Sequence, residues 1–155
     1  MLTWAIAFSR KKEAIAQFSY GALIKAINKV LPEKTVDCYE IMQLNQSFLS
    51  KLPTANFKGV DFLQNDGTNY DRIIANPPFS RNQDIVHIQE MYTLLNPGGG
   101  IVTVASTHWQ HSNNCSEKRF KDWLKFVNAK IIPVEAGSFK TSGTNIVAVI
   151  LLINR

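Results

Sequence analysis

Apolar residues recur along the chain with two alternating periods, one typical of helices and the other of strands. Residues 21–31 carry apolar side chains at helical spacing and are followed by Pro32, which marks the end of a helix. Residues 35–41 and 70–76 are rich in β-branched and aromatic side chains and indicate strands. Further helices are predicted at 45–52 and at 85–95, where the turn residues 96–100 end the second helix, and a third begins after an N-cap at Ser116. Further strands are predicted at 57–60, 101–106, 130–134 and 145–153.

Strands therefore alternate with helices, and most of the strands are nearly continuous apolar runs. Such strands are typical of a mainly parallel sheet that helices cover on both faces. Residues 135–144 are too few for a helical crossover between the last two strands, which predicts an antiparallel C-terminal strand. The expected fold is a Rossmann-like α/β domain with a doubly wound, mainly parallel sheet, spanning residues 1–155 with an atypical N-terminal segment at 1–20.

Composition narrows the class of protein. The 155 residues are 45% hydrophobic and 19% charged, which fits one globular domain and excludes a disordered or low-complexity chain. The longest apolar run, 146–153, is shorter than the roughly 20 residues of a membrane-spanning helix. The N-terminus lacks the order of a secretory signal, and Cys38 and Cys115 are expected to be reduced thiols. We expect a cytoplasmic protein that contacts no membrane, whose net charge of +5 permits binding to a polyanion.

The strongest motif is Asn76-Pro77-Pro78-Phe79, which directly follows the apolar strand DRIIA. Doubly wound sheets bind their ligands outside the carboxyl ends of the strands. The motif resembles the signature (D/N/S)PP(Y/F/W) of class I S-adenosylmethionine-dependent methyltransferases, specifically the N6-adenine DNA methyltransferase-like group. Three more segments resemble that family in register: VDCYEI its acidic strand, GVDFL its next motif, and LLNPGGGIVTV the strand after the NPPF helix. The resemblance runs from about Gly21 to the C-terminus.

The chemistry of the NPPF motif suits methylation of an exocyclic amine, whose lone pair is delocalised into the ring. The amide oxygen of Asn76 and the carbonyl of Pro77 can accept the two amino hydrogens and so localise that lone pair. Pro77 and Pro78 hold these acceptors in a fixed turn, and Phe79 can stack on an extruded base, worth about 1–3 kcal/mol per base. The resemblance implies the same catalytic roles. In the alternative interpretation, Asn-Pro-Pro only ends a strand and Phe79 packs in the core.

The resemblance also implies S-adenosylmethionine as the cofactor, bound by Gly21, Glu40, Asp61, Phe62 and Asn76. Glu40 would accept the ribose hydroxyls and Asp61 the adenine amine, and Phe62 would pack on the adenine ring. The alternatives are a solvated carboxylate at the end of a strand for Glu40, and a turn aspartate followed by a buried phenylalanine for residues 61–62.

The N-terminal part of the sequence departs from the family. Its members carry a glycine-rich turn after the first strand, whereas only Gly21 remains here and Ser19 stands where the earlier glycine is expected. Phe18 and Tyr20 add bulk where close backbone approach is needed. Either residues 2–8 or residues 13–18 could supply the first strand, or neither. Two interpretations stay open: the chain binds the cofactor weakly or differently, or it is a fragment or degenerate copy of an active enzyme.

Residues 107–114 follow a strand on the ligand side and are candidates to line the substrate opening. The spacing of His108, His111 and Cys115 is irregular and a fourth ligand is missing, so a polar loop without a metal is favoured over a zinc site.

Basic residues between 118 and 125 lie on the polar face of one predicted helix and either touch phosphates or form a solvated face. Lys140, in the loop between the last two strands, is a candidate contact to the backbone of a substrate.

The leading hypothesis is methyl transfer from S-adenosylmethionine to the N6 amino group of adenine in DNA, with RNA as an alternative acceptor. A second hypothesis is a catalytically impaired, methyltransferase-like nucleic-acid-binding module. A third is a protein glutamine N5-methyltransferase, although that branch of the family usually carries Tyr where this chain has Phe79. No dedicated target-recognition domain fits in this length, so three alternatives stay open for sequence specificity: a partner, such as a specificity subunit or a second copy of the chain, loops of this chain, or no specificity at all.

Overall fold

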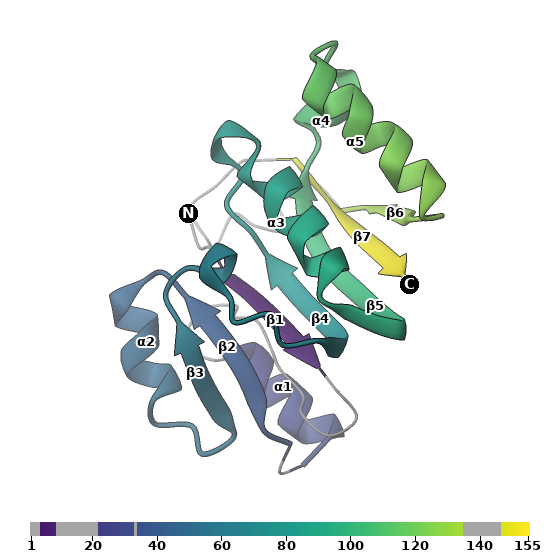
Figure 1. Cartoon of the computed structure of the whole chain (residues 1–155). Helices are drawn as coiled ribbons and strands as arrows, with labels where there is room; N and C mark the ends of the chain where they lie inside the picture. Colours follow the sequence, from purple (N-terminus) through teal and green to yellow (C-terminus); the bar gives the residue numbers. More distant parts are fainter. Residues whose placement is uncertain (1–3, 9–21, 33, 135–146) are drawn as a thin grey trace.

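The computed structural model describes residues 4–8, 22–32, 34–134 and 147–155. Within these residues, seven strands form one sheet in the order β3-β2-β1-β4-β5-β7-β6 (Figure 1). The strands are β1 (Trp4–Phe8), β2 (Val36–Glu40), β3 (Ala55–Gly59), β4 (Tyr70–Asn76), β5 (Leu95–Ser106), β6 (Lys130–Pro133) and β7 (Ala148–Asn154). The helices are α1 (Ala22–Val30), α2 (Gln43–Leu49), α3 (Gln83–Thr93), α4 (His108–His111) and α5 (Cys115–Phe126), with 3₁₀ turns η1 (Phe62–Gln64) and η2 (Ser80–Asn82).

The strand directions confirm the predicted fold class. β2 runs parallel to β3, and β4 runs parallel to β5. β7 is antiparallel to both β5 and β6, so the predicted antiparallel C-terminal strand is confirmed. In Figure 1, α3 lies in front of β4 and β5, whereas α1 lies on the far side of the sheet. The chain is therefore a Rossmann-like α/β domain with helices on both faces.

The first strand runs in a direction that the sequence did not predict. β1 falls within residues 2–8 and is antiparallel to both of its neighbours, β2 and β4. A ladder of either direction satisfies the backbone hydrogen bonds, and the apolar run WAIAF has the same pattern in both directions, so periodicity could not fix it. As a result, the beginning of β1 lies at the carboxyl edge of the sheet, where Trp4 pairs with both Glu40 and Asn76.

A large part of the core lies between the sheet and α3, and α1, α2 and α5 also contribute buried side chains to it. Ile85, Ile88 and Met91 recur at helical spacing on α3 and are buried against the sheet. The sheet contributes Ile73 from β4 and Ile101 from β5, both almost fully buried. Each such side chain contributes about 1.5–3 kcal/mol to the stability of the fold. This packing fixes α3, and with it the turn that leads from β4 into the helix.

Residues 96–100 begin β5 instead of ending α3, in contrast to the prediction. The segment from Leu95 to Gly100 lies opposite the shorter segment from Tyr70 to Arg72, so β5 bulges here. A Cβ at Gly99 would lie 2.8 Å from the carbonyl oxygen of Asn96, so the bulge requires glycine at this position.

The N-cap of α5 is Asn114, not Ser116 as predicted. Asn and Ser are equally favoured at this position, so composition could not separate two candidates only two residues apart. The hydroxyl of Ser116 instead donates to Oε2 of Glu117, at 2.6 Å. The segment predicted as a polar loop contains the short helix α4, whose Trp109 is buried.

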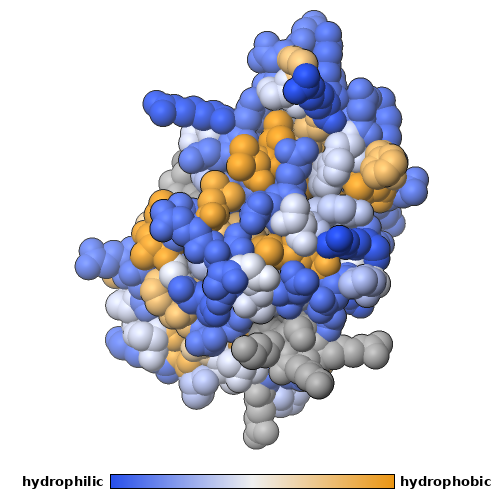
Figure 2. Space-filling model, in the orientation of Figure 1, coloured by the Kyte–Doolittle hydropathy of each residue, from blue (hydrophilic) through white to orange (hydrophobic). Residues whose placement is uncertain are grey.

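No helix in the described parts of the chain is long and apolar enough to cross a membrane. The face of the molecule in Figure 2 is mainly hydrophilic, with hydrophobic residues in patches between the hydrophilic ones.

Candidate functional site

Three strands end in polar residues at one edge of the sheet. Glu40 ends β2, Asn76 ends β4 and Ser106 ends β5. Because Trp4 pairs with both Glu40 and Asn76, those two residues lie on either side of β1. Two strand spacings of about 4.8 Å separate their backbones by about 9.5 Å. Ligands of doubly wound sheets bind at this edge.

The NPPF motif forms the turn that leaves β4. Pro77 is buried, whereas Asn76, Pro78 and Phe79 are partly exposed. The alternative interpretation of the motif requires Phe79 to be enclosed in the core, but Phe79 is partly exposed. The turn continues into η2, where Arg81 and Asn82 both adopt positive φ angles, 56° and 61°.

Glu40 is fully buried at the end of β2. Its Oε1 accepts the backbone N–H of Met42 at 2.8 Å, and its Oε2 accepts the side-chain amide of Asn45 at 3.1 Å. Burial raises the pKa of Glu40, and the hydrogen bonds from Met42 and Asn45 partly oppose that rise. The carboxylate thus lies at the predicted edge, in contact with the first turn of α2, and it is not a solvated cap.

Asp61 and Phe62 follow β3. The Oδ1 of Asp61 accepts the backbone N–H of Leu63 at 2.9 Å and caps η1. Phe62 is 3% exposed and packs edge-to-face on Tyr39, with ring centroids 5.4 Å apart. It also stacks on the ring of His87, with ring centroids 6.1 Å apart. Burial lowers the pKa of His87 below its usual value. Asp61 is partly exposed and Phe62 is largely covered, so the pair has the geometry of a turn aspartate followed by a core phenylalanine.

A buried polar cluster at the end of β5 was not predicted from the sequence. Asp84, at the start of α3, is fully buried. Its Oδ2 accepts both the backbone N–H of Ser106, at 3.0 Å, and the hydroxyl of Ser106, at 2.6 Å. The Ser106 hydroxyl also contacts Nδ1 of His108. The cluster joins α3 to the carboxyl end of β5.

His108 extends this cluster to the segment that follows the NPPF motif. Its Nε2 contacts Oδ1 of Asn82, and the side-chain amide of Asn82 donates to Oε1 of Glu117 at 2.9 Å. Hydrogen bonds from Ser116 first, and then from Asn82 and Asn114, lower the pKa of Glu117 to about 2. The only sequence signal for this arrangement was the position of residues 107–114 after a strand on the ligand side.

Other predicted features are placed as follows. Gly21 and Lys140 lie outside the described residues. Among the residues that the structure describes, no group of three or more His, Cys, Asp or Glu side chains could hold a metal ion. On α5, the ammonium of Lys121 donates to backbone carbonyls of the preceding segment, and Lys125 pairs with Asp122 at 2.9 Å.

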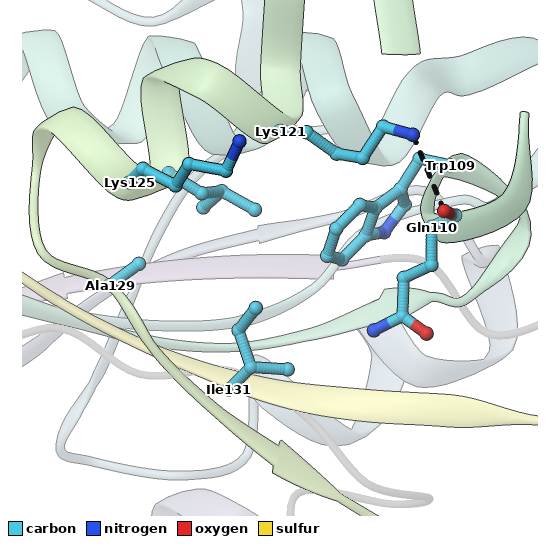
Figure 3. Close-up of a pocket in the computed structure, with 7 residues that line it drawn as sticks. Trp109, Gln110, Lys121, Lys125, Ala129 and Ile131 are labelled. Carbon is cyan, nitrogen blue, oxygen red and sulfur yellow. Dashed lines mark hydrogen bonds between the residues drawn. The ribbon is translucent and has the colours of Figure 1, made fainter. Parts of the chain in front are cut away.

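A pocket of about 240 Å³ lies between α4, α5 and β6 (Figure 3). Its walls are mainly apolar and include Trp109, Leu124 and Ile131, and Lys121 and Lys125 also line it. The indole Nε1 of Trp109 is buried without a hydrogen-bond partner. None of the predicted catalytic or cofactor residues lines this pocket.

Neither a protein-family model nor a curated protein matches the sequence. Solved structures of methyltransferases share its fold. The O-methyltransferase from Bacillus cereus in complex with SAH aligns with a TM-score of 0.50 and 10% identity, over 79% of this chain and 63% of that one. The plantazolicin methyltransferase BpumL in complex with SAH aligns with a TM-score of 0.57 and 14% identity, over 88% and 72%. A modification subunit assigned to a type I restriction enzyme from Vibrio vulnificus YJ016 aligns with a TM-score of 0.58 and 16% identity, over 88% and 37%.

These similarities define the fold as that of class I S-adenosylmethionine-dependent methyltransferases. The chain spans 63% of the length of the Bacillus cereus enzyme and 37% of the modification subunit. At sequence identities of 10–16%, these similarities show a shared fold and nothing more.

Proposed function

We propose that this chain is a methyltransferase domain that transfers the methyl group of S-adenosylmethionine to the N6 amino group of adenine in DNA. The observation that carries the proposal is the NPPF turn at the carboxyl end of β4, with Phe79 partly exposed and Asn76 across β1 from the carboxylate of Glu40. The methyltransferase fold supports methyl transfer as the reaction, and the modification subunit among the similar structures supports DNA as the acceptor.

The described residues offer part of a site for the cofactor, which supplies a sulfonium-bound methyl group when bound. Ribose hydroxyls and the adenine amine both donate hydrogen bonds, and carboxylates accept them. Glu40 at the end of β2 suits the ribose hydroxyls, and Asp61 after β3 suits the adenine amine. Binding at Glu40 would exchange the Asn45 amide for a ribose hydroxyl, because Glu40 is buried and already accepts that amide. Asp61 is partly exposed and suits the adenine amine. No described residue is assigned to the methionine portion.

At the acceptor, Asn76 and Pro77 would accept the two amino hydrogens through the side-chain amide oxygen and the backbone carbonyl. Two acceptors on these hydrogens direct the lone pair of the nitrogen away from the base plane and toward the methyl carbon. Phe79 would stack on the base. Alignment of the nucleophile with the methyl carbon then contributes most of the rate.

The test is incorporation of methyl groups into an adenine-containing oligonucleotide, measured as N6-methyladenine. Asn76→Ala is expected to lower kcat by about 10²–10³-fold, the usual effect of losing one such polar contact in a transition state. Asn96→Ala is the matched control: the Asn96 amide donates to Asp71 at the opposite edge of the sheet, so kcat should not change. An unchanged rate in Asn76→Ala would refute the assigned role.

Two other functions have distinct signatures in calorimetric titration and in methyl labelling of a protein fraction. An impaired, nucleic-acid-binding module would bind the oligonucleotide but would show no heat of binding with S-adenosylmethionine. A glutamine methyltransferase would place the label in a protein fraction and none in the oligonucleotide. The proposal also includes a specificity subunit or a second copy of the chain as the source of sequence preference.

A further inference from the structure

The turn after the NPPF motif holds two consecutive residues in the left-handed region. Arg81 has φ 56° and ψ 35°, and Asn82 has φ 61° and ψ 22°. This conformation is uncommon outside glycine and costs of order 1 kcal/mol or more per residue. It persists only where surrounding contacts determine the backbone conformation.

The side chain of Asn82 supplies such contacts on both sides of the turn. Its Nδ2 donates to Oε1 of Glu117 on α5 at 2.9 Å, and its Oδ1 contacts Nε2 of His108 on α4. His108 is anchored in turn through Ser106 to the buried Asp84. Asn82 thereby connects the residues after Phe79 to elements that lie 26 and 35 positions away in the sequence.

The carboxylate of Glu117 determines which atoms of the Asn82 side chain donate and accept hydrogen bonds. Glu117 can only accept, so the Asn82 amide group faces it and the Asn82 carbonyl oxygen accepts from Nε2 of His108. The Ser106 hydroxyl donates to Asp84 and also contacts Nδ1 of His108.

We propose that Asn82 and His108 are positioning residues that hold the NPPF turn in the geometry needed for the acceptor base. The pair fixes the exit of the turn against the end of β5 and the start of α5, and so sets the direction of Asn76 and Phe79. The inference rests on the proposed function for its effect on the reaction, and on the structure alone for its effect on the turn.

The decisive variant is Asn82→Gly. Glycine adopts the left-handed conformation more readily than asparagine, so this variant keeps the backbone and removes only the side-chain contacts of Asn82 with Glu117, His108 and Ser116. If Asn82 served only to tolerate a positive φ, the variant would have an unchanged kcat and equal or greater stability to urea. We expect kcat to fall by about 100-fold, the cost of a small misplacement of reacting groups. The affinity for S-adenosylmethionine should be unchanged.

Asn128→Gly is the matched control. Asn128 also has a positive φ, 51°, directly after the C-cap of α5, but it is outside the Asn82–His108 cluster. The same substitution there should leave kcat unchanged. If Asn128→Gly lowered kcat as much as Asn82→Gly, the assignment would be overturned.

Amide hydrogen exchange provides a readout that does not depend on activity. The backbone N–H of Gln83 donates to the carbonyl of Ser80 within the turn. We expect this amide to exchange at least 10-fold faster in Asn82→Gly than in the wild-type protein, with no change in Asn128→Gly. His108→Ala, at an exposed position, should give the same faster exchange and serves if Asn82→Gly fails to fold.

The two measurements distinguish the role of Asn82 and His108 in the turn from the proposed methyltransferase activity. A wild-type protein that methylates nothing would refute the proposed function, while the exchange of the Gln83 amide would still decide whether the pair holds the turn. Wild-type exchange in both Asn82→Gly and His108→Ala would overturn the inference even in an active enzyme.

Discussion

Replacing Glu40 with glutamine separates its packing role from its proposed contact with the cofactor. The side chain is fully buried and accepts hydrogen bonds at 2.8 Å from Met42 and at 3.1 Å from Asn45. Glutamine is nearly isosteric, its oxygen can keep the bond from Met42, and the Asn45 amide can turn to present its oxygen to the new NH₂ group. Weaker neutral hydrogen bonds replace the charged ones, and the burial cost of the charge is removed.

These effects act in opposite directions on stability. Bonds to a charged group contribute about 1.5–3 kcal/mol and neutral ones about 0.5–1.5 kcal/mol, and the removed desolvation cost is of the same order. The free energy of unfolding of Glu40→Gln should therefore lie within about 1 kcal/mol of wild type. In cofactor binding, no gain offsets the loss caused by Glu40→Gln, because the ribose hydroxyl donates to a neutral amide oxygen instead of a charged carboxylate. We expect a loss of about 2 kcal/mol, or about 30-fold in Kd.

The assays are calorimetric titration with S-adenosylhomocysteine and urea unfolding followed by fluorescence. Asp37→Asn is the matched control: Asp37 is a buried carboxylate of the same strand that accepts from Asn56 at 2.7 Å and from Tyr70 at 3.1 Å. It pairs with Ala7, away from the carboxyl edge, so its substitution should lower stability and leave Kd unchanged. Wild-type affinity in Glu40→Gln would refute the reasoning.

The same variant tests the sign of a pH effect. Burial raises the pKa of Glu40 above its ordinary value, so the folded state binds the proton more tightly than the unfolded state. Stability should therefore fall as pH rises from the ordinary value of a glutamate through the raised one. Glu40→Gln should remove this part of the pH dependence, and urea midpoints measured across that interval check it.

Two further predictions concern the surroundings of the site. Hydrogen bonds, first from Ser116, hold the pKa of Glu117 at about 2. The stability that Glu117 contributes is therefore complete above the ordinary glutamate pKa of 4.5 and is lost as pH falls toward 2. Ser116→Ala should shift the acid-unfolding midpoint to higher pH, and an unchanged midpoint would contradict this. In the bulge of β5, a Cβ on Gly99 would meet the carbonyl oxygens of Asn96 at 2.8 Å and Asp71 at 3.1 Å, whereas on Gly100 it would meet the Asn154 side chain at 2.9 Å. Gly99→Ala should therefore cost about 1–3 kcal/mol in urea unfolding and Gly100→Ala less, because a side chain can move and backbone cannot; the reverse order would refute this account.

The sequence by itself determined the alternation of helices and strands, the antiparallel C-terminal strand and the position of NPPF at the end of a strand. Each of these depends on local chemistry, such as apolar period, proline and the length of a connection, which a linear pattern records. The location of Glu40 at the end of β2 was predicted for the same reason.

Tertiary structure decided the direction of β1, because an apolar run of five residues has the same pattern read either way. It also decided how Asp84, Ser106, His108 and Glu117 come together around Asn82. Asp84 and Ser106 are 22 positions apart, and Asn82 and Glu117 are 35 apart. Each is an ordinary polar residue in its own segment, and only the packing of α3 and α5 at the carboxyl edge of the sheet brings them within hydrogen-bond distance.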